Sequence, residues 1–251
     1  LYDRLVHQDE KQQLIPGLAT EWRAVDDTTW EFKLRRGVKF HDGSDFDAQD
    51  VLATLRRIPA VPNSPSSFAV FTKAITDTSV VDPYTIRFKT ASAYPMLPYD
   101  LVAVAIISRK QEKAATPDFT AGKASNGTGP YKLVSFAQGD RAVLERNDAY
   151  WGAKPNWPRV TMRFISNNPA RVAALLAGDV QLIENVPSTD IEKIESNAAF
   201  RLDRQISNLL MYLHMDTFRD STPHATDAQG KPLAKSPLKD PRVRHALSLA
   251  I

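Results

Sequence analysis

The sequence of 251 residues contains no cysteine, and its formal net charge is only +3. A chain without cysteine has no disulfide scaffold, no zinc–thiolate site and no thiol nucleophile, and the absence fits an oxidising compartment. The basic residues occur in twos and threes with acids among them, so no basic patch predicts a nucleic-acid partner. The longest apolar run, residues 101–107, is far shorter than the roughly 18 residues of a spanning helix. We therefore expect a soluble protein.

Apolar residues make up 43% of the chain, which is enough to build a core. Residues 18–36 alternate between apolar and polar positions around Asp26-Asp27-Thr28, a pattern that predicts a β-hairpin. Two more hairpins are predicted over residues 75–90 and 131–147. Single strands are predicted at residues 105–108, 159–165, 180–184, 201–207 and 209–215.

Helices are predicted between these strands. Asp47 and Asp50 favour a helix start, Arg56 and Arg57 favour its end, and Pro59 and Pro62 stop it. Further helices are expected at residues 96–104, at 169–178 with Gly178 as the C-cap, at 188–195, and from Pro241 onward with Asp240 as the cap. Residues 118–129 and 218–236 are predicted loops. The order of elements predicts a mixed α/β fold.

The densest acidic cluster, Asp42, Asp45, Asp47 and Asp50, lies beside His41. Carboxylate oxygens bind hard cations, but the position of Gly43 does not fit an EF-hand loop. We favour a turn followed by a helix N-terminus, where carboxylates are stabilised by the helix dipole. A metal-dependent hydrolase built on this cluster is kept as an alternative.

The sequence has no HExxH, GxSxG or GxxxxGK[ST] motif, so no catalytic residue, metal ligand or cofactor is assigned. Gly127-Thr128-Gly129-Pro130 is followed by a predicted strand, whereas a phosphate loop is followed by a helix. We expect a tight turn that packs closely on its neighbours. Trp151 and Trp157 lie in a segment rich in Pro and Gly, and we expect both to pack at a subdomain seam.

Four longer blocks carry a family resemblance. In chain order they are PGLATEWRAVDDTTWEFKLRRGVKFHDGSDFDAQDVLATLRRI, NGTGPYKLVSFAQGDRAVLERNDAYWGAKPNWPRVTMRFI, ARVAALLAGDVQLIENVP and PLKDPRVRHALSLAI. Together they resemble the family 5 extracellular solute-binding proteins, the peptide-, dipeptide- and nickel-binding receptors of bacterial ABC importers. The match covers nearly the whole chain. Gln181, where the family usually has an acid, and Asp148-Ala149, where Pro-Asp is common, are departures that weaken the assignment of a particular ligand.

The resemblance implies a class II periplasmic binding protein fold, in which two lobes close on a solute. Residues 1–14 and 156–251 would form the main part of lobe I, residues 15–155 an additional subdomain of that lobe, and lobe II would be absent from this chain. It also implies a receptor, not an enzyme, that is monomeric at full length and binds a peptide or similar small solute. The receptor would deliver this solute to membrane permease subunits, in the periplasm or outside the cell.

The resemblance places ligand contacts in the loop after the first helix, where we select Ser66, Ser67 and Phe68. An extended loop offers backbone groups to a peptide main chain, and a phenyl ring offers an apolar wall. Thr128 and Asn208 are selected as further contacts. A sensor or chaperone-like module on the same fold is the alternative function.

Overall fold

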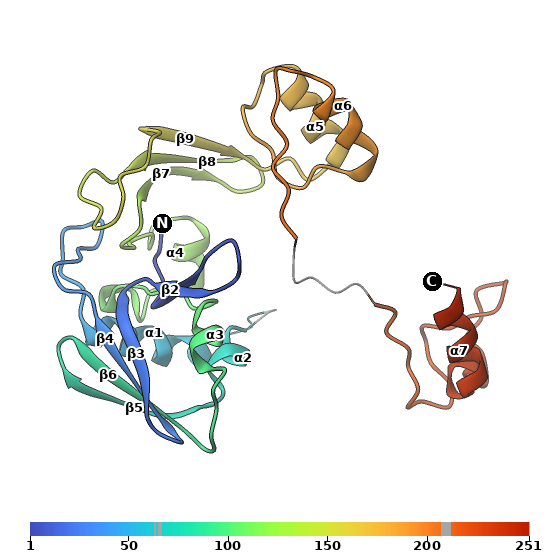
Figure 1. The fold of residues 1–251 in the computed structure, drawn as a ribbon, viewed down its shortest axis with the longest axis horizontal. Coiled ribbons are helices and arrows are strands. Elements are labelled where there is room, and N and C mark those ends of the chain that lie inside the picture. Colours follow the sequence, from blue (N-terminus) through green and yellow to red (C-terminus); the bar gives the residue numbers. More distant parts are fainter. Residues whose placement is uncertain (63, 65–66, 207–211, 251) are drawn as a thin grey trace. The chain divides into compact units, whose positions relative to one another are not determined.

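The structure, a computed structural model, describes residues 1–62, 64, 67–206 and 212–250 (Figure 1). The chain divides into two compact units, Leu1–Leu202 and Asp203–Ile251. This boundary differs from the lobe and subdomain limits that the resemblance implies, which stay a prediction. Among the described residues, no helix has the length and apolar character needed to cross a membrane.

The first unit contains a four-stranded antiparallel sheet in the order β3-β4-β6-β5. Its strands are β3 (Ala19–Asp26), β4 (Thr29–Leu34), β5 (Ile75–Asp82) and β6 (Thr85–Thr90). The two predicted hairpins are therefore confirmed. Phe32, Ile86 and Phe88 point to one face and are fully buried, while Glu31 and Arg87 form an ion pair on the other. The alternation read from the sequence thus places a core on one side only.

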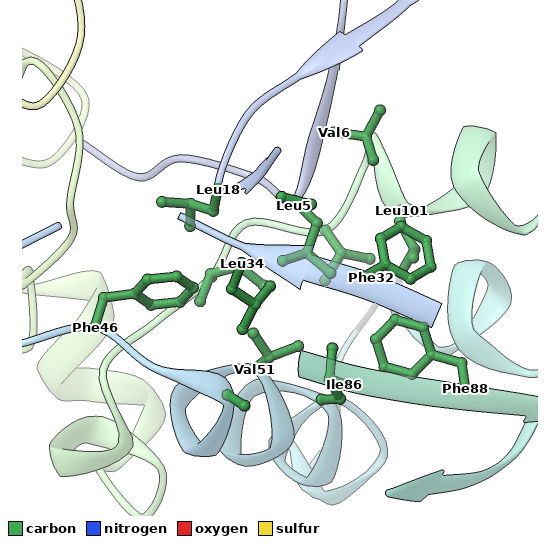
Figure 2. Packing of buried hydrophobic residues seen from close by; sticks show 14 of the residues in the cluster. Leu5, Val6, Leu18, Phe32, Leu34, Phe46, Val51, Ile86, Phe88 and Leu101 are labelled. Carbon is green, nitrogen blue, oxygen red and sulfur yellow. The ribbon is translucent and has the colours of Figure 1, made fainter. Parts of the chain in front are cut away.

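Helix α1 (Ala48–Ala60) covers the buried face of this sheet, and its Val51 joins the same cluster as Phe32 and Ile86 (Figure 2). Each fully buried side chain of this size contributes roughly 1.5–3 kcal/mol to stability. Asp47 caps the helix as predicted. Of the two prolines predicted to stop the helix, Pro59 lies inside its last turn, where a proline removes only one hydrogen bond, and the helix ends at Ala60, before Pro62.

A second antiparallel sheet has the order β7-β8-β9. It consists of β7 (Tyr131–Ala137), β8 (Arg141–Arg146) and β9 (Arg159–Arg163). The third predicted hairpin and the strand after it are confirmed. Phe136 and Phe164 meet edge to face on this sheet with their ring centroids 5.9 Å apart.

Short elements precede the first sheet, interrupt it and lead from it to the second. They are β1 (Val6–Gln8) and β2 (Leu14–Pro16), which pair with each other, α2 (Ala69–Thr72), α3 (Leu97–Leu101), α4 (Thr116–Thr120) and a 3₁₀ turn at Arg109–Gln111. Helix α3 is shorter than predicted. The predicted strand at 105–108 is reduced to one bridge between Arg4 and Ala105, and the loop predicted from residue 118 contains the end of α4.

The end of the first unit holds α5 (Asn168–Leu176), a 3₁₀ turn (Ser188–Asp190) and α6 (Ile191–Glu195), which share a small apolar core. The strand predicted at 180–184 is wrong. Val180 and Ile183 pack on this core instead. The carbonyl oxygen of Glu184 accepts a hydrogen bond from the Arg171 guanidinium at 3.0 Å, which ties this segment to α5.

In the second unit, a 3₁₀ turn (Pro237–Lys239) precedes α7 (Pro241–Leu249), which Asp240 caps as predicted. The strands predicted at 201–207 and 209–215 are not formed in residues 201–206 and 212–215. Alternation of apolar and polar residues does not by itself make a strand, because the hydrogen bonds of a strand need a neighbouring strand. None of the described strands pairs with these residues.

Candidate functional site

An exposed apolar surface lies where the loop after α1 turns into α2. We call it the α2–α3 edge and define it by Phe68, Val70, Met96 and Tyr99, which are 52%, 54%, 50% and 45% exposed. Helices α2 and α3 contact each other in the first unit (Figure 1). The edge therefore groups exposed large side chains from two segments that are distant in the sequence, which is typical of a binding surface.

The local structure holds Phe68 at this edge. Helix α2 is a single turn, and the Phe71 amide donates to the Phe68 carbonyl oxygen at 3.0 Å. The Phe68 and Phe71 rings tilt against each other with centroids 5.9 Å apart. Ser67 is exposed, and its Oγ accepts a hydrogen bond from the Ala69 amide at 3.2 Å. The Ser67 hydroxyl is thus oriented as an acceptor toward the chain and keeps its own proton for another partner.

Helix α3 presents two different faces. Leu97 and Leu101, four residues apart, are buried in the core, whereas Met96 and Tyr99, three residues apart, are exposed. Asp100 accepts a hydrogen bond from the Tyr94 hydroxyl at 2.8 Å, and this bond raises the pKa of Tyr94. The α3 part of the edge therefore exposes the Tyr99 ring and the Met96 thioether, and the same helix carries the Asp100 carboxylate.

The selected residues fall in different places. Ser67 and Phe68 are at the α2–α3 edge, and both are exposed. Ser66 and Asn208 lie outside the described residues. Thr128 is fully buried, and its hydroxyl donates to the Asp3 carboxylate at 2.9 Å. Solute contact by these residues stays a prediction.

Thr128 belongs to a second group of polar residues, the Asp3 network, which we define as Asp3, Thr128, Tyr150 and Trp151. The Asp3 carboxylate also accepts hydrogen bonds from the Trp151 indole at 2.8 Å and the Tyr150 hydroxyl at 3.2 Å. Burial and the nearby Asp3 charge raise the pKa of Tyr150 well above its usual range. Three neutral donors thus satisfy the hydrogen-bonding capacity of a buried carboxylate.

The glycine turn joins this network to its surroundings. The His41 amide donates to the Gly127 carbonyl at 2.8 Å, and the His41 Nε2 lies 3.0 Å from the Gly129 oxygen. A Cβ at Gly127 would overlap the Leu1 carbonyl oxygen. The prediction of a closely packed turn is confirmed.

The two tryptophans differ. Trp151 packs against the core and under the Arg35 guanidinium, whose carbon lies 4.3 Å from the ring centroid, as expected of a packing residue. Trp157 is 70% exposed, so the prediction that it packs is wrong. Its position is fixed instead by the backbone, since its carbonyl oxygen accepts from the Tyr131 hydroxyl at 3.0 Å.

The four carboxylates of the acidic cluster each pair with a basic side chain. Arg109 binds both Asp47 and Asp50, while Asp42 binds Lys110 and Asp45 binds Lys39, over 2.6–2.8 Å. Burial opposes ionisation of Asp42, but hydrogen bonds from Lys110 and Ser44 outweigh it and hold its pKa well below the usual range. No three His, Asp or Glu side chains of the described chain converge on a metal position. The interpretation as a helix start is confirmed by the capping box of Asp47 and Asp50.

Sequence reasoning missed the contribution of α3 to the edge. The signal was present in the segment AYPMLPYDL, where two prolines open a short helix and Met96 and Tyr99 fall outside the apolar stripe of Leu97 and Leu101.

Comparison with known proteins identifies the chain. Residues 13–251 match the family described as bacterial extracellular solute-binding proteins, family 5 Middle. The chain belongs to this family. The glutathione-binding protein GsiB of Pectobacterium atrosepticum is 29% identical over 252 residues, covering all of this chain and 46% of GsiB. The probable ABC transporter periplasmic-binding protein SapA of Escherichia coli is 28% identical over 274 residues, covering all of this chain and 47% of SapA. The family 5 chain thus spans less than half the length of these relatives.

Solved structures confirm the fold of the family 5 chain. The murein tripeptide binding protein MppA of Escherichia coli aligns with a TM-score of 0.70 and 26% identity over 79% of this chain and 42% of MppA. NikA of Brucella suis, in complex with Fe(III)-EDTA, aligns with a TM-score of 0.67 and 30% identity over 78% of this chain and 41% of NikA. The chain is therefore a mixed α/β part of a periplasmic binding protein fold, as the resemblance implied.

Proposed function

We propose that the chain forms much of one lobe of an extracytoplasmic receptor that binds a peptide or similar small solute and delivers it to the permease subunits of an ABC importer. Family membership supports the receptor. The names of the relatives, a glutathione-binding protein and a probable ABC transporter periplasmic-binding protein, support the solute class and the transporter. The location proposed is the periplasm or cell exterior, with membrane contact through the permease.

The observation that carries the proposal is the contrast between exposed and paired side chains. At the α2–α3 edge, apolar side chains are exposed with nothing packed over them in the described residues. The carboxylates of the acidic cluster and of the Asp3 network are instead held by internal partners. An exposed apolar surface can bind a solute by packing against it, and we propose that the α2–α3 edge does so without catalysing a reaction.

Phe68 and Ser67 are proposed as direct solute contacts. The Phe68 ring, supported from behind by Phe71, offers a rigid apolar wall to a peptide side chain. Ser67 offers a hydroxyl proton to a carbonyl oxygen of the solute. Ser66, Thr128 and Asn208 are kept as proposed contacts. The hydroxyl of Thr128 is buried and donates to Asp3.

The test is titration calorimetry of the full-length protein with glutathione and with a set of di- and tripeptides. Phe68→Ala is expected to weaken binding of the preferred solute about tenfold or more, the usual loss for a buried aromatic contact. Phe136→Ala is the matched control, because Phe136 is also an exposed aromatic but lies on the β7-β8-β9 sheet. Equal affinity of Phe68→Ala and the native protein would exclude the edge as the site. Absence of binding by every solute would overturn the receptor proposal.

A further inference from the structure

A separate hollow lies at the end of α1, on the described residues just before the loop that leads to α2. Its volume is about 680 Å³. Its walls are formed by small apolar side chains from the end of α1 and from the segment before α4. Three basic side chains and one acidic side chain also line it. The lining residues are Arg56, Arg57, Ala60, Val61, Pro62, Glu112, Lys113, Ala114, Ala115, Thr116 and Pro117. We call it the α1 hollow.

The charges of the α1 hollow do not cancel. Both carboxylate oxygens of Glu112 are engaged by Arg56, at 3.1 Å and 3.2 Å, so this pair is neutral. Arg57 and Lys113 have no acidic partner in the part of the chain that the structure describes. Two positive charges therefore face the hollow without a matching negative side chain.

Arg57 is held in place. Its Nη1 donates to the Glu112 carbonyl oxygen at 2.8 Å, and its guanidinium lies 4.4 Å from the centroid of the Phe119 ring. Its remaining N–H groups keep their capacity to donate. A cation fixed by a backbone bond and an aromatic ring loses little side-chain entropy when an anion binds, which is the usual advantage of a preorganised site.

The end of helix α1 opposes this charge only in part. A helix C-terminus carries roughly half a negative charge from its unpaired carbonyl groups. Arg57 and Lys113 together carry two positive charges, so the net field in the α1 hollow favours an anion. The apolar walls of Ala60, Val61 and Ala115 favour an uncharged body next to that anion.

We infer that the α1 hollow is a binding site for a small carboxylate with an apolar body, with Arg57 and Lys113 holding the carboxylate. The α2–α3 edge is not involved, so the inference stands independently of the proposed function. The site accepts an amphipathic acid whose length fits the hollow. It discriminates against an amine of the same length, because the amine would add a third unpaired positive charge.

The test is an NMR titration of the ¹⁵N-labelled chain with octanoate. We expect saturable shifts at the amides of Ala114 and Ala115, with a dissociation constant on the order of 1 mM, the affinity usual for about ten non-hydrogen atoms. Octylammonium is expected to give no saturable shifts at these amides. Lack of saturation with octanoate, or equal response to the amine, would overturn the inference.

Charge variants sharpen this test. Lys113→Gln is expected to raise the dissociation constant of octanoate about fivefold, and Arg57→Gln about tenfold. Lys11→Gln, an exposed lysine in the turn between β1 and β2, is the matched control and should leave it unchanged. Since Arg57 also bonds the backbone, Lys113→Gln decides the matter if Arg57→Gln does not fold. Native affinity in Lys113→Gln would contradict the assigned role of this lysine.

Discussion

The Asp3 network and the α2–α3 edge use polar and apolar side chains in opposite ways. In the network a carboxylate is 3% exposed, and three donors are directed at it. At the edge, large apolar side chains are about half exposed. Buried hydrogen bonds fix one arrangement of the chain, whereas exposed apolar surface is stabilised only when something covers it. The framework and the proposed binding surface thus differ in how deeply their side chains are buried.

The largest effect is expected from Asp3→Ala. The change leaves the Trp151 indole and two hydroxyl groups without their acceptor, and each buried unpaired group costs about 1–3 kcal/mol. We expect a loss of about 4 kcal/mol in the free energy of unfolding, measured by urea denaturation. Asp3→Asn keeps one acceptor oxygen and should lose about half as much. A loss below about 1 kcal/mol in Asp3→Ala would show that the network is not part of the framework.

A smaller effect is expected from Gly127→Ala. The new methyl group would overlap the Leu1 carbonyl oxygen, and overpacking costs typically about 1–3 kcal/mol. The control is Gly139→Ala, where the backbone has φ +76° but a Cβ meets no atom within 4 Å. That change should cost about 1 kcal/mol from backbone strain alone. If thermal denaturation ranks the two variants in the reverse order, the close approach of Leu1 is not what requires glycine at position 127.

The pH dependence of stability should report on His41, which connects the glycine turn to the acidic cluster. Burial lowers the pKa of His41, with the Gly129 hydrogen bond opposing and the positive charges of Lys132 and the N-terminus adding to it. The unfolded chain, with an ordinary histidine pKa of about 6.5, then binds more protons than the folded chain. Stability is therefore complete above about pH 6.5 and is lost as pH falls below that value through the folded pKa.

The measurement is the melting temperature from pH 8 to pH 5, compared between the native chain and His41→Gln. The native chain should lose more stability than the variant over this range, because glutamine does not titrate. His7, whose pKa burial also lowers, contributes to both curves and cancels in the comparison. Parallel curves would show that His41 is not linked to folding.

Local patterns predicted the hairpins and the helix caps, because these depend on neighbours in the sequence. The Asp26-Asp27-Thr28 turn, the Asp47 cap and the Asp240 cap are examples. Residues 180–184 have a strand pattern, yet Val180 and Ile183 pack against α5 and α6 instead. The pattern specifies an apolar segment, and the choice between sheet and loop depends on which partner lies nearby.

The candidate site was predicted only in part for a similar reason. Phe68 and Ser67 came from the family resemblance, and the structure adds α3, whose contact with α2 joins residues about 30 positions apart. The partners of Asp3 lie more than 120 positions along the chain, at Thr128, Tyr150 and Trp151. No spacing rule relates positions so distant, so Thr128 was selected without its buried partner being foreseen.

The smallest effect on stability is expected from Tyr99→Ser at the edge. Tyr99 is about half exposed, and removing an exposed ring usually changes the free energy of unfolding by no more than about 0.5 kcal/mol. Leu97→Ala in the same helix is the matched control, since Leu97 is fully buried and its truncation should cost about 2–5 kcal/mol. Both are measured by urea denaturation. A large loss in Tyr99→Ser would mean that the edge is part of the framework, and the distinction between the two regions would then fail at α3.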